Sequence, residues 1–144
     1  MEVEIREHLE DRTNVIITCK EVTNDIQKLK SYIEAFDERI LAQKEAEIVF
    51  VEIADTLYFE AVDNRTFLYT KEQVVEVKQR LYELEERLPK LDFFRCSKSI
   101  IVNINKIKNL KPQLNRTIMI TMCNDEKLTI SRRYVKAFKD ILGI

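Results

Sequence analysis

The sequence predicts one strand-rich α+β domain with a short N-terminal appendage. Its 144 residues suffice for one hydrophobic core and exclude two large domains. In several short runs beyond residue 46, apolar residues alternate with polar ones at a period of two, which is typical of strands. Helical spacing of apolar residues is confined to three stretches of the chain. We therefore expect an appendage at residues 1–45 and a mainly β domain at residues 46–144.

The appendage is predicted to begin with two short strands. Val3 and Ile5 alternate with charged residues, and Val15, Ile17 and Cys19 continue the same alternation after a polar stretch. The charged residues between the two runs suit a solvated connection.

A helix is predicted to follow over residues 22–40. Its apolar residues recur at intervals of three and four, which places them on one helical face. The same spacing fits a three-heptad coiled-coil seam. Two roles stay open: packing on the two preceding strands, which is the commoner use of such a helix, and dimerisation. The dimerisation candidates are Val22, Ile26, Leu29, Ile33, Phe36 and Ile40.

The first half of the main domain is predicted to contain a hairpin, a third strand and a short helix. Residues 57–61 and 66–70 alternate in polarity around Asp63, Asn64 and Arg65, which are expected to form the turn. A strand at 74–78 then leads into a helix at 81–88, which ends at a proline.

The second half is predicted to contain three strands and a final helix. Alternation marks strands at residues 100–104, 118–122 and 128–130. The helix runs to residue 142, and the hydroxyl of Ser131 is expected to cap its first turn.

Residue counts exclude several functional classes. Gly143 is the only glycine, so neither a Walker-type phosphate loop nor a dinucleotide-binding turn can form. Cys19, Cys96 and Cys123 are far apart, and His8 is the only histidine, so we expect no metal site, no cofactor and no enzymatic activity. With no apolar run of membrane-spanning length and a charged first segment, the chain is expected to be cytoplasmic.

The near-neutral total charge hides a basic C-terminal third. The net charge is −4 over residues 1–45, −5 over residues 46–94 and +8 over residues 95–144. Basic residues of the last third recur beside strands and turns, a distribution suited to binding a polyanion. A solvated basic surface without a ligand is the alternative interpretation.

Three segments carry a resemblance to a known family. They are D-T-L-Y-F-E-A-V-D-N at residues 55–64, F-F-R-C-S-K-S-I-I-V-N-I-N-K-I at residues 93–107 and L-T-I-S-R-R-Y-V at residues 128–135. In this order and spacing, the chain from about residue 46 resembles the LytTR family of bacterial DNA-binding transcriptional regulators.

The resemblance implies an elongated arrangement of short strands that binds double-stranded promoter DNA. Loops rather than a recognition helix would enter successive major grooves, and two copies would bind tandem sites. The base-reading residues implied are Arg65 (or Thr66 if the alignment shifts by one), Lys98 and Arg133; long basic side chains suit guanine edges. The candidates for phosphate contact are Arg95, Ser97, Ser99, Asn103, Lys106, Arg116 and Arg132. For Asn103, anchoring of the adjoining loop is an equal alternative.

The resemblance also bears on regulation. About 45 residues precede the DNA-binding part, fewer than a receiver domain of about 100–150 residues requires, so we expect a stand-alone regulator. The resemblance also implies that a regulator of this build works with a membrane protein. We further expect this chain to form a homodimer. A different hypothesis is a protein interaction or adaptor module that acts through the N-terminal heptad helix.

Overall fold

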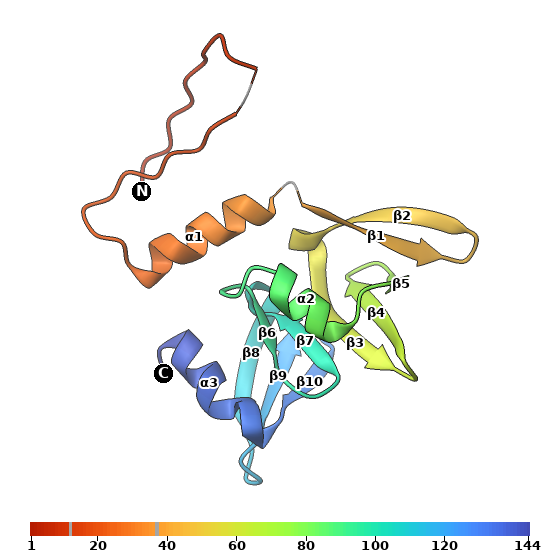
Figure 1. Cartoon of the computed structure of the whole chain (residues 1–144). Coiled ribbons are helices and arrows are strands. Elements are labelled where there is room, and N and C mark those ends of the chain that lie inside the picture. The colour runs from red at the N-terminus through yellow and green to blue at the C-terminus, as the bar shows by residue number, and fades with distance from the viewer. Residues whose placement is uncertain (12, 37) are drawn as a thin grey trace.

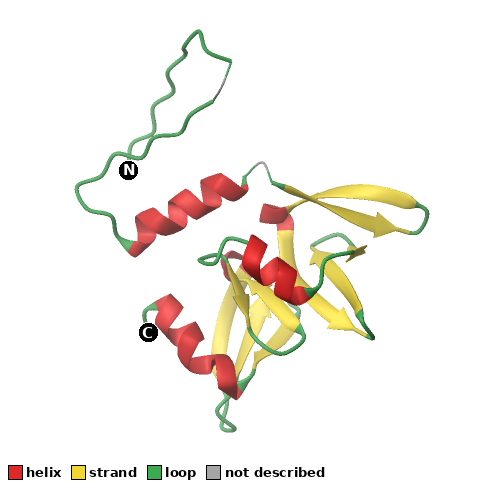
Figure 2. Cartoon of the chain, in the orientation of Figure 1, coloured by secondary structure: helices red, strands yellow, loops and turns green. Residues whose placement is uncertain are grey.

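The computed structural model describes residues 1–11, 13–36 and 38–144. Within these residues, two antiparallel sheets lie against each other, and three α-helices flank them (Figures 1 and 2). The elements are α1 (Asn24–Ala35), β1 (Arg39–Lys44), β2 (Glu47–Glu52), η1 (Ile53–Asp55), β3 (Thr56–Val62), β4 (Arg65–Thr70), β5 (Val74–Val77), α2 (Leu81–Arg87), β6 (Phe93–Arg95), β7 (Ile100–Asn103), η2 (Ile104–Lys106), β8 (Ile107–Pro112), β9 (Ile118–Met122), β10 (Lys127–Ile130) and α3 (Arg132–Leu142). The predicted strand-rich α+β class is confirmed.

The larger sheet contains seven strands in the order β2-β1-β5-β4-β3-β7-β6. Its predicted central hairpin, β3–β4, turns at Asp63 and Asn64, whose φ angles of 51° and 63° are both left-handed. Two such residues in succession suit the right-handed twist of a two-residue hairpin. Arg65 pairs with Val62 and therefore begins β4 instead of lying in the turn.

Two hydrophobic clusters stabilise the fold. The first lies between the larger sheet and α2 and includes the fully buried Phe59, Leu68 and Leu84. The second joins the larger sheet to the smaller one, whose strand order is β10-β9-β8, and to α3. Phe138 of α3 is fully buried there, with its ring 5.5 Å from that of Phe94. This packing holds the start of α3 close to the larger sheet.

The two predicted N-terminal strands are wrong. Residues 1–11 and 13–22 contain neither helix nor strand, and Val3 and Ile5 are 82% and 91% exposed. Alternation alone does not make a strand, because the backbone groups also need a pairing partner. In Figure 1 this segment extends away from the sheets.

The N-terminal helix is shorter than predicted, and its packing alternative is also wrong. Thr23 caps α1 with its hydroxyl, and the helix ends at Ala35. Since none of the described residues before it forms a strand, α1 lies instead against η1. Ile40 pairs with Val51 in β1 and is buried in the first cluster, so it cannot belong to an exposed helical seam. Ile40 fits the heptad spacing of the predicted helix, but it belongs to the alternating pattern of strand β1.

Two further details differ from expectation. Ser131 occupies the N-cap position of α3, but its side chain makes no capping hydrogen bond. The strand β1 precedes residue 46 yet pairs with both β2 and β5, so the larger sheet begins before the predicted boundary.

Candidate nucleic-acid interface

Backbone hydrogen bonds join the end of β3, the β6–β7 loop and the residue before α3. The amide of Ala61, near the β3–β4 turn, donates to the carbonyl of Ser99 in the β6–β7 loop at 2.8 Å. The amide of Ser131, just before α3, donates to the carbonyl of Cys96 in the same loop at 2.9 Å. We call the resulting surface the loop edge: residues 63–65, 96–99 and 131–133. It occupies the lower side of the molecule in Figure 1.

The β6–β7 loop is shaped by Arg95. Its guanidinium donates to the carbonyls of Ser97, at 2.8 Å, and of Lys98, and also pairs with the Glu85 carboxylate at 3.0 Å. The Arg95 side chain is only 20% exposed. The hydroxyl of Ser97 accepts from the amide of Ser99 within the loop. Arg95 is a predicted candidate for phosphate contact. Its hydrogen bonds hold the β6–β7 loop in a shape in which Lys98 is exposed.

Arg65 follows the β3–β4 turn of the loop edge, and its side chain already forms an ion pair within the chain. Its guanidinium donates to both carboxylate oxygens of Glu76 on β5, with Nε at 3.0 Å, and lies over the ring of Phe67. This ion pair raises the pKa of Arg65 and lowers that of Glu76. Thr66 is only 6% exposed. Of the two alternatives for this position, Arg65 is therefore the accessible one.

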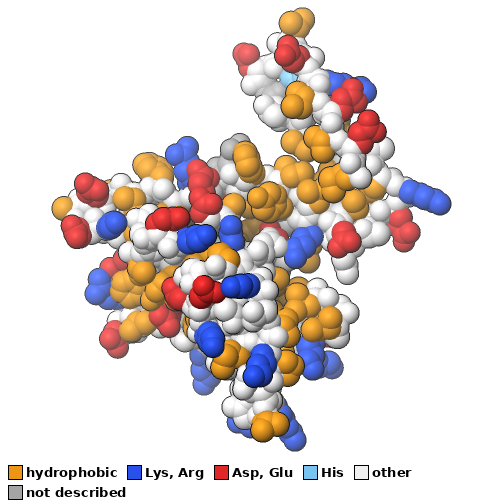
Figure 3. Space-filling model, turned by 180° about the vertical axis from the view of Figure 1, so that it is seen from behind, with side chains coloured by type: hydrophobic (Ala, Val, Ile, Leu, Met, Phe, Trp, Pro, Cys, Tyr) orange, Lys and Arg blue, Asp and Glu red, His pale blue; other side chains and the backbone are white. Residues whose placement is uncertain are grey.

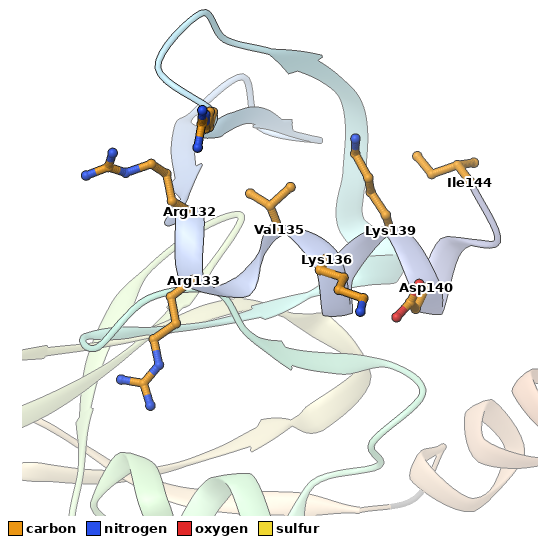
Figure 4. A pocket seen from close by; sticks show the side chains of 8 residues that line it. Arg132, Arg133, Val135, Lys136, Lys139, Asp140 and Ile144 are labelled. Atoms are coloured by element: carbon orange, nitrogen blue, oxygen red, sulfur yellow. The ribbon is translucent and has the colours of Figure 1, made fainter.

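Arg132 and Arg133 leave the first turn of α3 in different directions (Figure 4). Both are exposed, and the Arg133 guanidinium lies 5.7 Å from the centre of the Tyr134 ring. Tyr134 in turn meets Phe94 edge to face in the second cluster. Packing of the helix thus sets the position from which Arg133 extends.

A basic hollow beside α3 contains residues that sequence reasoning missed. It has a volume of about 710 Å³ and opens broadly to solvent. Lys136 and Lys139 line it together with Arg116 of the β8–β9 turn and the two arginines of α3. The sequence contains a pattern that could have predicted these lysines. Arg132, Lys136 and Lys139 follow one another at intervals of four and three, which places them on one helical face.

Two predicted phosphate contacts lie away from the loop edge. Asn103 is 2% exposed; its amide nitrogen donates to the carbonyl of Thr56 at 2.8 Å, and its side-chain oxygen accepts from the amide of Asn105. This geometry favours the anchoring alternative for Asn103. Lys106 is half-buried in η2, separated from the β6–β7 loop by the length of β7.

Charge is distributed unevenly over the surface. In the view from behind, the lower part of the molecule carries Lys and Arg side chains and almost no Asp or Glu, whereas both charges are mixed above (Figure 3). The lower part of the molecule is thus a basic surface region. Such a region attracts phosphate groups over distances of about 8 Å at physiological salt.

No group of three or more metal-ligating side chains occurs in the part of the chain that the structure describes. Burial raises the pKa of the Cys96 thiol to about 12, which keeps it protonated and a poor nucleophile at neutral pH. His8 lies exposed in the N-terminal segment, where its Nδ1 accepts from the amide of Glu10. None of the described helices is long and apolar enough to cross a membrane.

Comparisons with known proteins show which family this chain resembles in sequence and fold. Residues 46–143 match the family described as the LytTr DNA-binding domain. The chain is 33% identical over 102 residues to the transcriptional regulatory protein YpdB of Escherichia coli K12, covering 70% of this chain and 42% of YpdB. It is 30% identical over 125 residues to the sensory transduction protein LytT of Bacillus subtilis, covering 87% and 52%. The chain thus spans about half the length of these relatives or less.

A solved structure shares the fold. It is the LytTr DNA-binding domain of a putative methyl-accepting/DNA response regulator from Bacillus cereus, which matches with a TM-score of 0.72 and 31% identity. The match covers 75% of this chain and 99% of that one. From its strand topology, its basic loop edge and its match over residues 46–143, this chain belongs to the LytTR family of DNA-binding domains found in transcriptional regulators.

Proposed function

We propose that this chain regulates transcription by binding promoter DNA through the loop edge. In this proposal the β6–β7 loop and the start of α3 enter successive major grooves. Lys98 and Arg133 contact base edges, and Arg65 does so after releasing Glu76. Arg116, Arg132, Ser97 and Ser99 contact phosphates, and Lys136 and Lys139 extend that contact along the hollow. The proposed role is non-enzymatic.

One observation carries the proposal. The two backbone hydrogen bonds, Ala61 to Ser99 and Ser131 to Cys96, tie three segments distant in sequence into a continuous edge. Rigid placement matters because a side chain held in position loses less conformational entropy when it binds. Direct base contacts by arginine or lysine contribute on the order of 1–3 kcal/mol of discrimination each.

Fluorescence anisotropy with a promoter duplex and with base-substituted duplexes tests the proposal. We expect Arg133→Ala and Lys98→Ala to reduce discrimination at particular base pairs, and Arg132→Ala to weaken binding to all duplexes alike. With four cationic phosphate contacts, log affinity should fall against log salt with a slope of about −3.6. Lys30→Ala on α1 removes one positive charge far from the loop edge and serves as the control. Unchanged discrimination in Arg133→Ala would contradict the proposed base contact.

The proposal includes three finer expectations. The regulator acts as a homodimer, for which the exposed part of the α1 seam remains a candidate surface. It works in the cytoplasm, where promoter DNA is found. A membrane-protein partner is expected only from the family resemblance. Size measurement of the protein on a duplex with one or two sites, and copurification from membranes, test the first and third expectations.

A further inference from the structure

The N-terminal arm (residues 1–11 and 13–22) exposes apolar side chains along a segment without regular structure. Ile16 is 84% exposed and Val15 is 62% exposed. Hydrophobic side chains are visible along the arm in Figure 3. A sequence with strand-like alternation and no helix or strand of its own suits pairing with a strand that is already formed.

The β2 strand offers such a partner at the end of the larger sheet. It lies last in the strand order, so in the described chain one of its sides carries backbone groups without a neighbouring strand. The outward face of the β1–β2 hairpin has an apolar centre, bordered by the Arg39–Glu52 ion pair, whose arginine lies over the Phe50 ring. Leu41 and Phe50 are paired across the hairpin and are 55% and 65% exposed, and Ile48 beside them is 68% exposed. Contiguous exposed apolar surface of this kind marks interaction sites.

We propose that residues 13–20 of one copy pair with the β2 edge of a second copy, and that the two copies exchange arms symmetrically. The eight residues of this segment, extended over about 26 Å, are long enough to run along the whole of β2, whose six residues span about 20 Å. The charges of the two segments favour pairing of β2 with residues 13–20 over pairing with residues 1–11. The β2 strand and its turn carry Glu45, Glu47 and Glu52, of which Glu52 is paired with Arg39 of β1, whereas the only charged residue in 13–20 is Lys20. Residues 1–11 carry five acidic residues and one arginine, which Glu45 and Glu47 at the turn end of this edge repel.

A second copy fits better than the arm's own β2 strand. The arm joins the N-terminal end of α1, whereas β1 follows the other end. The 12 residues of α1 separate these ends by about 18 Å. In Figure 1 the arm projects from α1 on the side away from the β1–β2 hairpin. Exchange between two copies pairs both arms with both edges and closes the assembly with two-fold symmetry.

Sedimentation of the full chain without DNA tests this interface independently of the proposed function. The double variant Val15→Pro/Ile16→Pro removes two successive backbone donors, so one of them faces β2 whichever way the segment is turned. Both residues are exposed and outside the core, so the fold should be unaffected. We expect a dimer for the unmodified chain and a dissociation constant raised roughly 100-fold or more for this variant. The control Val3→Pro/Glu4→Pro, in the acidic half of the arm, should remain dimeric.

A mixing experiment distinguishes exchange from other dimers. Phe50→Glu on β2 should also dissociate the dimer, but this variant keeps a normal arm. Mixed with Val15→Pro/Ile16→Pro, which keeps a normal β2, it should restore one of the two joints and form a measurable heterodimer. A monomeric unmodified chain would overturn the proposal. So would a dimer that survives Val15→Pro/Ile16→Pro and is lost in Leu29→Glu, which would assign the interface to α1.

Discussion

The hydroxyl of Tyr58 on β3 donates a hydrogen bond to the carboxylate of Glu126 in the β9–β10 turn and so connects the two sheets. The Tyr58 ring also stacks on that of Tyr69, with 4.2 Å between the ring centres, and the Tyr69 hydroxyl donates to Glu60. Because α3 follows β10 directly, this connection fixes where the arginines of α3 lie relative to the β3–β4 turn. The stability of the sheet pair and the shape of the loop edge are therefore linked.

Removal of this hydroxyl should destabilise the fold. In Tyr58→Phe the ring and its stacking remain, but the hydrogen bond to a charged group is lost, which typically costs about 1.5–3 kcal/mol. The free energy of unfolding in urea, measured by circular dichroism, checks this value. Tyr82→Phe, whose side chain is 63% exposed on α2, is the matched control and should change little. Equal stability of the two variants would contradict a structural role for the bond.

Alkaline pH should weaken the same region. Burial, followed by the hydrogen bond to Glu60, raises the pKa of Tyr69 to about 12, and burial with Glu126 raises the pKa of Tyr58 further. Below pH about 10 both hydroxyls are protonated in the folded and unfolded chains, and their contribution is fully present. Between about 10 and 12 the unfolded chain loses these protons first, so the free energy of unfolding falls as pH rises. Urea titrations across this range should show a smaller decline in Tyr69→Phe than in the unmodified chain.

Arg95→Lys should weaken DNA binding although it keeps the charge. A lysine cannot donate at once to the carbonyls of Ser97 and Lys98 and to Glu85, so the β6–β7 loop loses its fixed shape. We expect a loss of about tenfold in affinity for every duplex, from the loss of about one net hydrogen bond or more. Arg132→Lys is the control, since an exposed phosphate contact tolerates lysine. Similar losses in both variants would contradict the loop-shaping role.

Glu76→Gln should strengthen DNA binding. Glu76 holds both donors of the Arg65 fork and also repels phosphate, so its neutralisation frees Arg65 for the duplex. We expect a gain of about two- to fivefold in affinity at low salt, since an exposed ion pair contributes only modestly. Glu72→Gln removes the same charge at the far end of β4 and tests for a general charge effect. An equal gain in both variants would remove Arg65 from the interface.

Much of the fold could be predicted from period-two alternation and turn chemistry. The β3–β4 hairpin was predicted correctly because Asp63 and Asn64 interrupt two alternating runs with residues that tolerate left-handed backbone. The β1–β2 hairpin was missed because Ile40 fits both a helical and a strand pattern, and the run 48–51 is apolar without alternation. The N-terminal strands were predicted wrongly, since a local pattern says nothing about a pairing partner. Tertiary context decided each of these cases.

The candidate site was less accessible to sequence reasoning. The basic residues and the loops that carry them could be found, but the contact between these loops depends on bonds that join residue 61 to 99 and residue 96 to 131. Nor does a sequence tell which arginine is already engaged, as Arg95 and Arg65 are. Asn103 illustrates the limit, because only its burial separates an anchor from a phosphate ligand. The assigned DNA contacts themselves stay predictions.

The position of β1 in the larger sheet affects how this protein can be divided. The strand lies between β2 and β5, although the family match begins only at residue 46. A fragment cut at that residue would retain β2 without its hydrogen-bonded neighbour and would bare the flank of β5, inviting aggregation. Aggregation of such a fragment would therefore result from the missing β1 strand and not from the loss of a separate oligomerisation unit. A cut before residue 39 keeps all seven strands and allows the role of α1 and the arm to be measured alone.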